Sequence, residues 1–184
     1  DISVSGAATC LQAAPRQSFA YSAATRSLTV GVTTSGVGAY SGAVTINNTD
    51  LTSNGAGMGV ADANDTINVS ATILNHASPS LVESATTLNQ TIDFGSVNRN
   101  SGVHTLPATI FNLSSTAGLT AWLYVDSVSG VGTPVESLGV IGTTLVPMSG
   151  IGEGASQAGQ VSLDSSQPAG SYQVQYTIAT SDEN

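Results

Sequence analysis

Alternation of apolar and polar residues with a period of two constrains the fold of this chain more than any other feature. In the segments 67–73 and 172–178 every second residue is apolar: Ile67, Val69, Ala71 and Ile73 in the first, and Tyr172, Val174, Tyr176 and Ile178 in the second. Successive side chains of a strand point to opposite faces of its sheet, so this pattern is typical of half-buried antiparallel strands. The same pattern predicts strands at 28–32, 91–94, 103–111 and 119–128.

Glycine-containing turns separate these predicted strands, for example at Ser35-Gly36, Asn54-Gly55 and Ser101-Gly102. Short strands at this spacing indicate a β-sandwich or a barrel. The hydrophobic content of 40% is enough for a core, and the aromatic content of 5% makes that core mainly aliphatic. We expect an all-β protein with an immunoglobulin-like antiparallel β-sandwich.

The charge of the chain excludes several classes of function. It contains 12 acidic residues against three arginines and no lysine, for a net charge of −9. A chain without a basic patch does not neutralise phosphates, so we expect no nucleic-acid partner, and an anionic membrane surface would repel it. No apolar run approaches the roughly 20 residues of a membrane-spanning helix. This acidic, lysine-free composition favours an extracellular or cell-surface location.

Two segments of the chain resemble each other at an offset of 132 residues. Residues 38–50 read GAYSGAVTINNTD, and residues 170–182 read GSYQVQYTIATSD. Upstream, residues 4–6 resemble residues 128–130, and residues 28–30 resemble residues 161–163. These matches occur in one order, which indicates an internal repeat. Five aligned positions in the two segments are identical: Gly38/Gly170, Tyr40/Tyr172, Thr45/Thr177, Ile46/Ile178 and Asp50/Asp182.

The two copies are incomplete in complementary ways. With Asp1 aligned to Asp126, the first copy has no counterpart of residues 84–125, and the second has none of residues 51–80. We therefore expect a partial immunoglobulin-like unit over residues 1–80 and a second unit over residues 81–184 that lacks its last strand. Two interpretations stay open. Either the chain is part of a longer array, or the strand carrying Ile67, Val69, Ala71 and Ile73 completes the sheet of a neighbouring copy or subunit.

Several motifs resemble those of a known group of modules. They are Thr91–Val97 (TIDFGSV), Phe111–Leu113, Thr116–Leu119, Val125–Gly130 and the closing segment from Ala169 to Glu183. Together they resemble the choice-of-anchor and ASPM/SPD-2/hydin-like modules of secreted bacterial surface proteins. That resemblance implies immunoglobulin-like sandwiches in tandem and no catalytic residues. The Ala-Gly-x-Tyr close is also similar to pilus-type and spore-coat-type domains that assemble by strand complementation.

Two glycines, two tyrosines and two further aromatic residues are candidate structural positions. A glycine two residues before a tyrosine at a strand start permits a tight turn, and the tyrosine hydroxyl then reaches backbone. We expect such corners at Gly38 with Tyr40 and at Gly170 with Tyr172. We expect Phe94 and Trp122 to lie in or near the core of the second copy rather than to stack on a ligand.

A search for catalytic motifs favours a protein that is not an enzyme. No GxSxG elbow or phosphate-binding glycine loop is present, and His76 and His104 do not have zinc-ligand spacing. Cys10, the only cysteine, lies too far before both histidines for a blue-copper site. Nothing in the sequence brings two of the 12 acidic residues together as a glycosidase pair.

Calcium is the best metal hypothesis, because calcium prefers carboxylate and carbonyl oxygens. The oxygen-rich stretch that begins at Asp50 continues through Asp62, Asn64 and Asp65. A polar loop with Asx turns is the alternative explanation, and no other cofactor is expected.

Together these observations predict a structural role without catalysis. We expect a building block of a surface layer, stalk or self-assembling fibre, with self-association or neighbouring repeats as its partners. The alternative is a carbohydrate-binding or adhesive module of a larger secreted protein. Aromatic side chains exposed together on one sheet would favour carbohydrate binding, whereas buried aromatic residues with an open edge strand would favour assembly.

Overall fold

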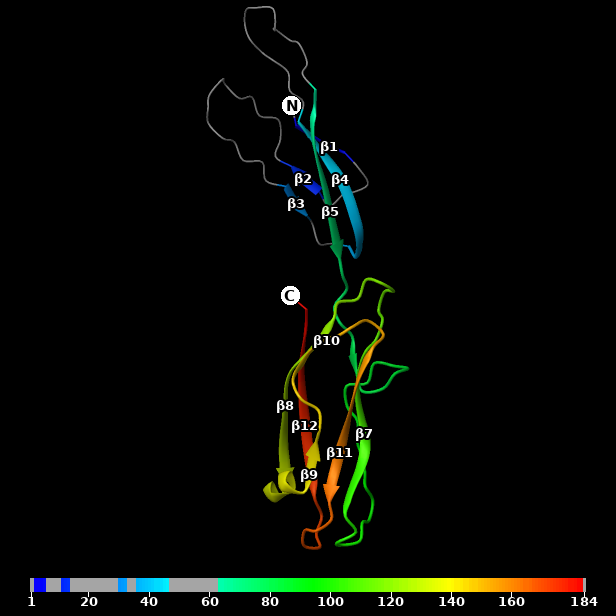
Figure 1. Ribbon diagram of the computed structural model, residues 1–184, viewed down its shortest axis with the longest axis vertical. Helices are drawn as coiled ribbons and strands as arrows, with labels where there is room; N and C mark the ends of the chain where they lie inside the picture. Colours follow the sequence, from blue (N-terminus) through cyan, green and yellow to red (C-terminus); the bar gives the residue numbers. More distant parts are fainter. Residues whose placement is uncertain (1, 6–10, 14–29, 33–35, 47–62, 184) are drawn as a thin grey trace, which may run out of the picture. The chain divides into compact units, whose positions relative to one another are not determined.

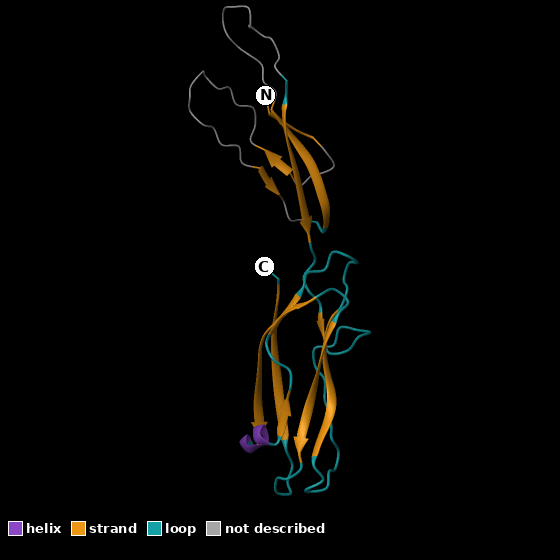
Figure 2. Ribbon diagram, viewed as in Figure 1, coloured by secondary structure: helices purple, strands orange, loops and turns teal. Residues whose placement is uncertain are grey.

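The computed structural model describes residues 2–5, 11–13, 30–32, 36–46 and 63–183. The chain divides into two compact units, Asp1–Leu74 and Asn75–Asn184. The prediction of an all-β fold with antiparallel sheets is confirmed, because every strand pairing in the described residues is antiparallel (Figure 2). The one helical segment described is the short 3-10 helix η1 (Val135–Gly139). No helix among these residues is long and apolar enough to cross a membrane.

The division after Leu74 differs from the predicted boundary after residue 80. Backbone hydrogen bonds explain the difference. The N–H of Asn75 donates to the carbonyl of Leu119 at 2.7 Å, and the N–H of Ala121 donates to the carbonyl of Asn75 at 2.8 Å. Strand β6 (Pro79–Ser80) pairs with β7 (Val103–Asn112). Residues 75–80 are therefore tied to the second unit.

Unit 1 contains a three-stranded sheet with the order β1-β4-β5. Its strands are β1 (Ile2–Ser5), β4 (Gly38–Ile46) and β5 (Asp65–Ile73). Strand β5 pairs with β4 along its whole length, from Gly38 opposite Ile73 to Ile46 opposite Asp65. Strands β2 (Leu11–Ala13) and β3 (Val30–Val32) form a separate two-stranded pair.

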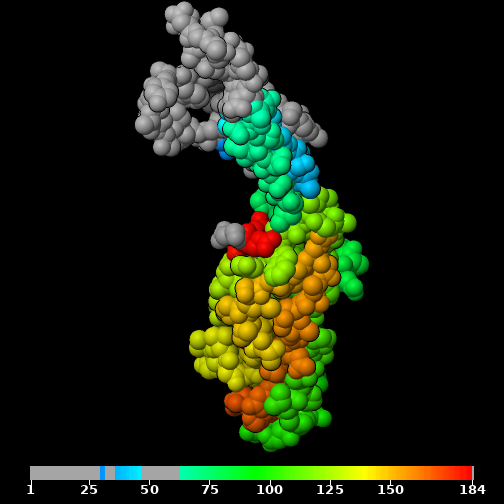
Figure 3. Space-filling model, turned by 45° about the horizontal axis from the view of Figure 1, so that its top comes forward, coloured from blue at the N-terminus to red at the C-terminus, as the bar shows by residue number. Residues whose placement is uncertain are grey.

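Unit 2 contains two sheets, which Figure 1 shows as two layers. The four-stranded sheet has the order β6-β7-β11-β9, with β11 at Ser156–Asp164 and β9 at Ile141–Thr143. The three-stranded sheet has the order β10-β8-β12. Its strands are β10 (Met148–Ile151), β8 (Leu123–Thr133) and β12 (Gln173–Asp182). In Figure 3 the orange residues of β11 lie beside the green residues of β7, its hydrogen-bonded neighbour.

The core of unit 2 lies between these two sheets. Ile110 of β7 forms a cluster with Leu123 and Val125 of β8 and Ile151 of β10, and each of the four is at most 3% exposed. Burial of such a side chain contributes roughly 1.5–3 kcal/mol. Alternation along β7 and β8 thus places one face of each strand toward the other sheet, as the period of two predicts.

Buried polar groups link the loops to this core. The side chain of Asn112 is fully buried, accepts a hydrogen bond from the N–H of Ser78 at 2.9 Å, and donates to the carbonyls of Ala121 and Ile151 at 2.9 and 3.0 Å. A buried polar side chain is tolerated when its partners are supplied in this way. Asn112 therefore fixes the ends of β6, β8 and β10 against β7.

Two predicted strands differ from the structure. Residues 91–94 form no strand, although Ile92 and Phe94 are half-buried and Thr91 and Asp93 are exposed. The strand predicted at 119–128 begins later, at Leu123, and continues to Thr133. Alternation reports which residues face an apolar surface, and it does not require a hydrogen-bonded neighbour.

Candidate functional site at the edge of strand β12

Strand β12 is the one long edge strand described in unit 2. The other three edge strands, β6, β9 and β10, have two, three and four residues, whereas β12 has ten. On one side β12 pairs with β8 from Gln173 to Asp182, and on its other side none of the described strands pairs with it. Short edge strands resist further pairing, so β12 offers the longest row of backbone donors and acceptors for a new strand.

The side chains of β12 do nothing to protect this edge. From Gln173 to Ser181 the strand contains no charged residue and no proline. Natural edge strands are commonly blocked by lysine, proline or inward-pointing charges. The bulge between Ala179 and Thr180 lies in the second half of the strand and leaves residues 173–178 in regular pairing with β8.

A groove of about 1130 Å³ runs along the first half of β12. Its walls are formed by β12 and the segment 88–97, and its floor includes residues of β7, β9 and β11. Ten successive residues, 167–176, line it, and four of these, 173–176, belong to β12. Because neighbouring side chains of a strand point to opposite faces, a groove reaches them all only by following the strand edge. The apolar lining includes Ile92, Phe94, Leu163, Val174, Tyr176 and Ile178.

A glycine lies close to a tyrosine just before β12 and at the start of β4. The hydroxyl of Tyr172 donates to the carbonyl of Pro168 at 2.7 Å, the geometry that a tyrosine corner requires. A Cβ atom at Gly170 would lie 3.5 Å from the Tyr172 hydroxyl, and one at Gly38 would lie 3.5 Å from the Tyr40 ring. Gly38 also has a φ of +152°, which disfavours other residues there.

Tyr176 connects the edge strand to the opposite sheet. Its hydroxyl donates a hydrogen bond of 2.8 Å to the carbonyl of Ile141 in β9. Partial burial raises the pKa of Tyr176, because the surroundings disfavour the phenolate. The neutral hydroxyl therefore spans the space between the sheets at the groove.

At the other end of β12, Asp182 joins the strand to the start of unit 2. Its carboxylate accepts a hydrogen bond from the N–H of Ala77 at 2.9 Å and also contacts Nδ1 of His76. The hydrogen bond with His76 is the largest cause that lowers the pKa of Asp182, and the Ala77 N–H adds to the effect. Asp182 therefore holds the segment that contains His76 and Ala77 against the end of β12.

Glu153 makes a second carboxylate-centred cluster. It accepts hydrogen bonds from the hydroxyl of Ser114 and from the N–H groups of Gly118 and Thr120. The Ser114 hydrogen bond is the main cause that lowers the pKa of Glu153. The cluster holds the loop between β7 and β8, and among the described residues no group of three or more His, Cys, Asp or Glu could hold a metal ion.

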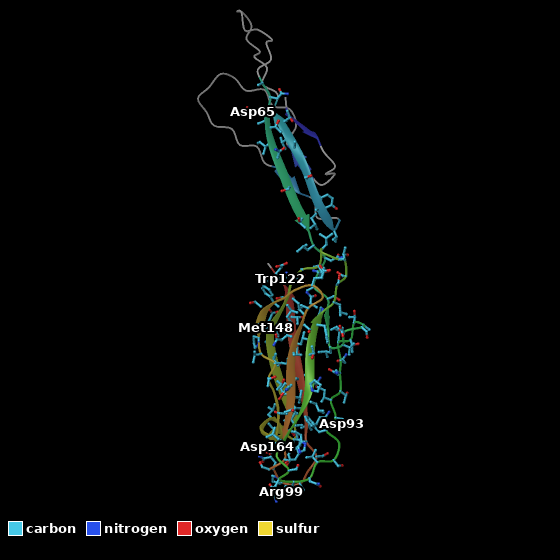
Figure 4. All side chains as sticks on the ribbon, turned by 45° about the vertical axis from the view of Figure 1, so that its right-hand side comes forward. Asp65, Asp93, Arg99, Trp122, Met148 and Asp164 are labelled. Atoms are coloured by element: carbon cyan, nitrogen blue, oxygen red, sulfur yellow. The ribbon has the colours of Figure 1, made fainter. Side chains whose placement is uncertain are left out.

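The two candidate core aromatic residues have different positions. Phe94 is half-buried and lines the groove. Trp122 is 51% exposed, so its expected core position is wrong. It lies one residue before β8 begins and rests on Gly150, where a Cβ atom would come within 3.2 Å of its ring. Figure 4 shows Trp122 near Met148 at the end of unit 2 that lies opposite Arg99.

The predicted calcium ligands are only partly described. Asp50 and Asp62 lie outside the described residues, and Asn64 and Asp65 are exposed at the start of β5. Calcium binding therefore stays a prediction. Cys10, weighed for a blue-copper site, also lies outside the described part, while His104 hydrogen-bonds to the hydroxyl of Ser101 at 2.7 Å.

The predicted exchange strand is β5, which pairs with β4 of its own unit. Of its four apolar residues, Val69, Ala71 and Ile73 are half-buried and Ile67 is 45% exposed. Sequence reasoning did not predict the groove beside β12. The half-buried alternation of residues 91–94 was its one signal, since those residues face an apolar surface without joining a sheet.

No family model, curated protein or solved structure matches this chain. The proposed function therefore rests on the geometry described above.

Proposed function

We propose that this chain is a non-catalytic, extracellular structural protein, a building block of a surface layer, stalk or self-assembling fibre. The observation that carries the proposal is the ten-residue edge of β12, uncharged until Asp182 and bordered by a groove whose lining includes Val174, Tyr176 and Ile178. An unpaired edge of this kind promotes aggregation of a monomeric protein, and it can pair with a strand of a neighbour in a protein that assembles. Joining of subunits by β-strand complementation is the assembly mode it supports.

An immunoglobulin-like sandwich without its last strand accounts for the sheet orders of unit 2. In that fold one sheet has the order A-B-E-D, and the other contains C, F and G side by side. The order β6-β7-β11-β9 matches the first sheet, and β8 and β12 match C and F. The open edge of β12 lies where strand G would pair.

Unit 1 supports the same assignment from the other side. Its order β1-β4-β5 corresponds to C-F-G, with β5 in the place that is open beside β12. The registers also agree: Ile2 lies opposite Ile46 and Ser3 opposite Thr45, as Val128 lies opposite Ile178 and Ser129 opposite Thr177. With β4 and β12 aligned at an offset of 132, β1 falls on β8 with Ile2 at Val128. That alignment is two residues from the one that matched Val4 to Val128.

Carbohydrate binding is the second candidate, and the exposed Trp122 favours it. An indole ring presented to solvent offers a flat apolar face with a polar edge, which is suited to stacking on a sugar. One observation opposes carbohydrate binding: among the described aromatic residues, Trp122 alone is exposed. The other described aromatic residues are half-buried, so they form no exposed platform with it.

Negative-stain electron microscopy and light scattering on the same sample test the structural role. Filaments, sheets or a concentration-dependent rise in mass are the expected result. A homogeneous monomer over the full concentration range would contradict assembly. Trp122→Ala, screened with the parent on a glycan array, tests the second candidate: loss of a sugar signal that the parent gives would favour it.

A further inference from the structure

We propose that the free edge of β12 and the adjacent groove bind an extended strand of a neighbouring module. This strand runs antiparallel to β12 and alternates apolar and polar side chains as β5 does. The inference rests on the proposed function and deepens it, because it names the binding surface and the chemistry of its occupant.

The first argument is the occupant of the corresponding edge in unit 1. The segments 38–46 and 170–178 share a Gly-x-Tyr motif and a Thr-Ile pair at an offset of 132 residues; the motif begins β4 and directly precedes β12. Residues 38–46 of β4 pair with β5, and the corresponding residues of unit 2 are 170–178. The groove follows β12 along this same stretch, since its lining includes residues 167–176 and Ile178. The groove therefore marks the place where a β5-like strand would lie.

The second argument is the burial of side chains beneath each edge. Val44 of β4 is fully buried, and the residue at the corresponding place in β12, Tyr176, is only half-buried. Val174 and Ile178 are half-buried as well. Directly opposite residues of an antiparallel pair lie on the same face. A docked strand in the register of β5 would thus place apolar side chains over Val174 and Tyr176 and exclude water from the groove.

The register follows from the pairing of β4 with β5. Tyr40, Gly42 and Val44 lie opposite Ala71, Val69 and Ile67. The same register on β12 places the occupant's corresponding apolar positions opposite Tyr172, Val174 and Tyr176. Between 173 and 178 the strand is neutral, so its side chains and unpaired backbone groups suit a neutral, alternating strand.

The source of the strand follows from the pairing already present. The chain's β5 is held by β4 over nine residues. A second copy could donate its β5 only by separating it from its own β4. The edge of that β4 would then be unpaired, so no strand pairing would be gained overall. A strand from a neighbouring module leaves the β4–β5 pairing intact, and this makes it the favoured occupant.

A labelled peptide with the sequence of Asp65–Ile73 is the probe, used with the full chain. Its control has the same composition with the four apolar residues placed consecutively. We expect saturable binding of the first peptide and at least about tenfold slower hydrogen exchange at residues 173–178, because bound amides gain hydrogen-bond partners. Val174→Lys, which places a charge in the groove, should weaken binding at least about tenfold. Val131→Lys makes the same change on β8, at a residue that is 70% exposed and does not line the groove, and should change binding less than about twofold.

Absence of binding, equal binding of both peptides, or protection at β4 without protection at β12 would overturn the proposal. Protection of β12 in the peptide-free chain that rises with concentration, together with loss of protection at β4, would overturn it in favour of exchange between copies. The exchange experiment on the parent chain keeps the test valid if Val174→Lys fails to fold. Filaments of a chain that does not bind the peptide at β12 would contradict this inference alone, and peptide binding by a chain that stays monomeric would contradict the proposed assembly alone.

Discussion

The same Gly-x-Tyr motif begins β4 and directly precedes β12, yet β4 has a strand on each side and β12 has an open edge. Strand β4 lies between β1 and β5, whereas β12 pairs only with β8 among the described strands. The difference is visible in burial: Val44 is fully buried, and Tyr176 at the corresponding place is half-buried. The comparison shows that the sequence of a strand determines which side chains share a face, while the neighbouring strands determine how far those side chains are buried.

The largest effect should come from the core beneath the open edge. Leu123→Ala removes a side chain that is 1% exposed and should lower the free energy of unfolding of unit 2 by about 3 kcal/mol, through lost burial and a cavity. Urea unfolding followed by fluorescence of Trp122 measures it, since this is the only tryptophan. Val131→Ala, at a residue 70% exposed, is the matched control. A loss below about 1 kcal/mol would mean that a unit with an open edge lacks a cooperative core.

Truncation of valines on the two corresponding strands sharpens the comparison directly. Val44→Ala should cost about 2 kcal/mol, because the side chain is fully buried under the covered edge. Val174→Ala should cost less than about 1 kcal/mol, because its side chain is only half-buried. Hydrogen exchange at β4 and β12 reports the two losses separately. Equal costs would show that the open edge does not expose the residues beneath it.

Removal of a hydroxyl at the strand start should have a smaller effect. Tyr172→Phe deletes the hydrogen bond to the carbonyl of Pro168 and should lower the stability of unit 2 by about 1 kcal/mol. Thermal unfolding of this variant beside the parent measures the loss. An unchanged melting temperature would indicate that water replaces the hydroxyl at no cost.

The smallest effect is the pH dependence from Asp182. Its folded pKa lies below the ordinary value of 3.8, chiefly because of the hydrogen bond with His76. The ionised carboxylate therefore stabilises the folded state above about pH 3.8, and this contribution is lost as the pH falls through the folded pKa. Because His76 is exposed, we expect about 0.5 kcal/mol. Asp182→Asn should flatten the acid limb of a stability–pH curve, and an unaltered limb would contradict the assignment.

The sequence predicts most of the strands, since alternation reveals which residues share a face. Strands β5, β7 and β12 lie within two residues of the predicted starts, at Asp65, Val103 and Gln173. Alternation fails at residues 91–94, where Ile92 and Phe94 face the groove without strand pairing. The side of the backbone on which a side chain lies is separate from whether that backbone pairs with another strand. Only the side on which apolar residues lie produces a repeating pattern in the sequence.

The repeat predicted a second unit that lacks its last strand, because the second copy has no counterpart of residues 51–80. The groove beside β12 was not predicted, because its lining comes from β7, β9, β11 and the segment 88–97, which are far apart in the sequence. Trp122 shows the same limit, because its apolar ring predicted burial. Its place just before the first residue of β8 instead leaves it half in solvent.

The distribution of charge around β12 has a consequence for the kinetics of association. Between residues 75 and 184 the chain has eight acidic residues and one arginine, Arg99, while β12 is neutral until Asp182. Like-charged bodies repel over about 8 Å at physiological ionic strength, and over longer distances in dilute salt. Added salt should therefore speed the encounter of two such units, and a neutral strand edge is a surface on which they can meet against the least repulsion.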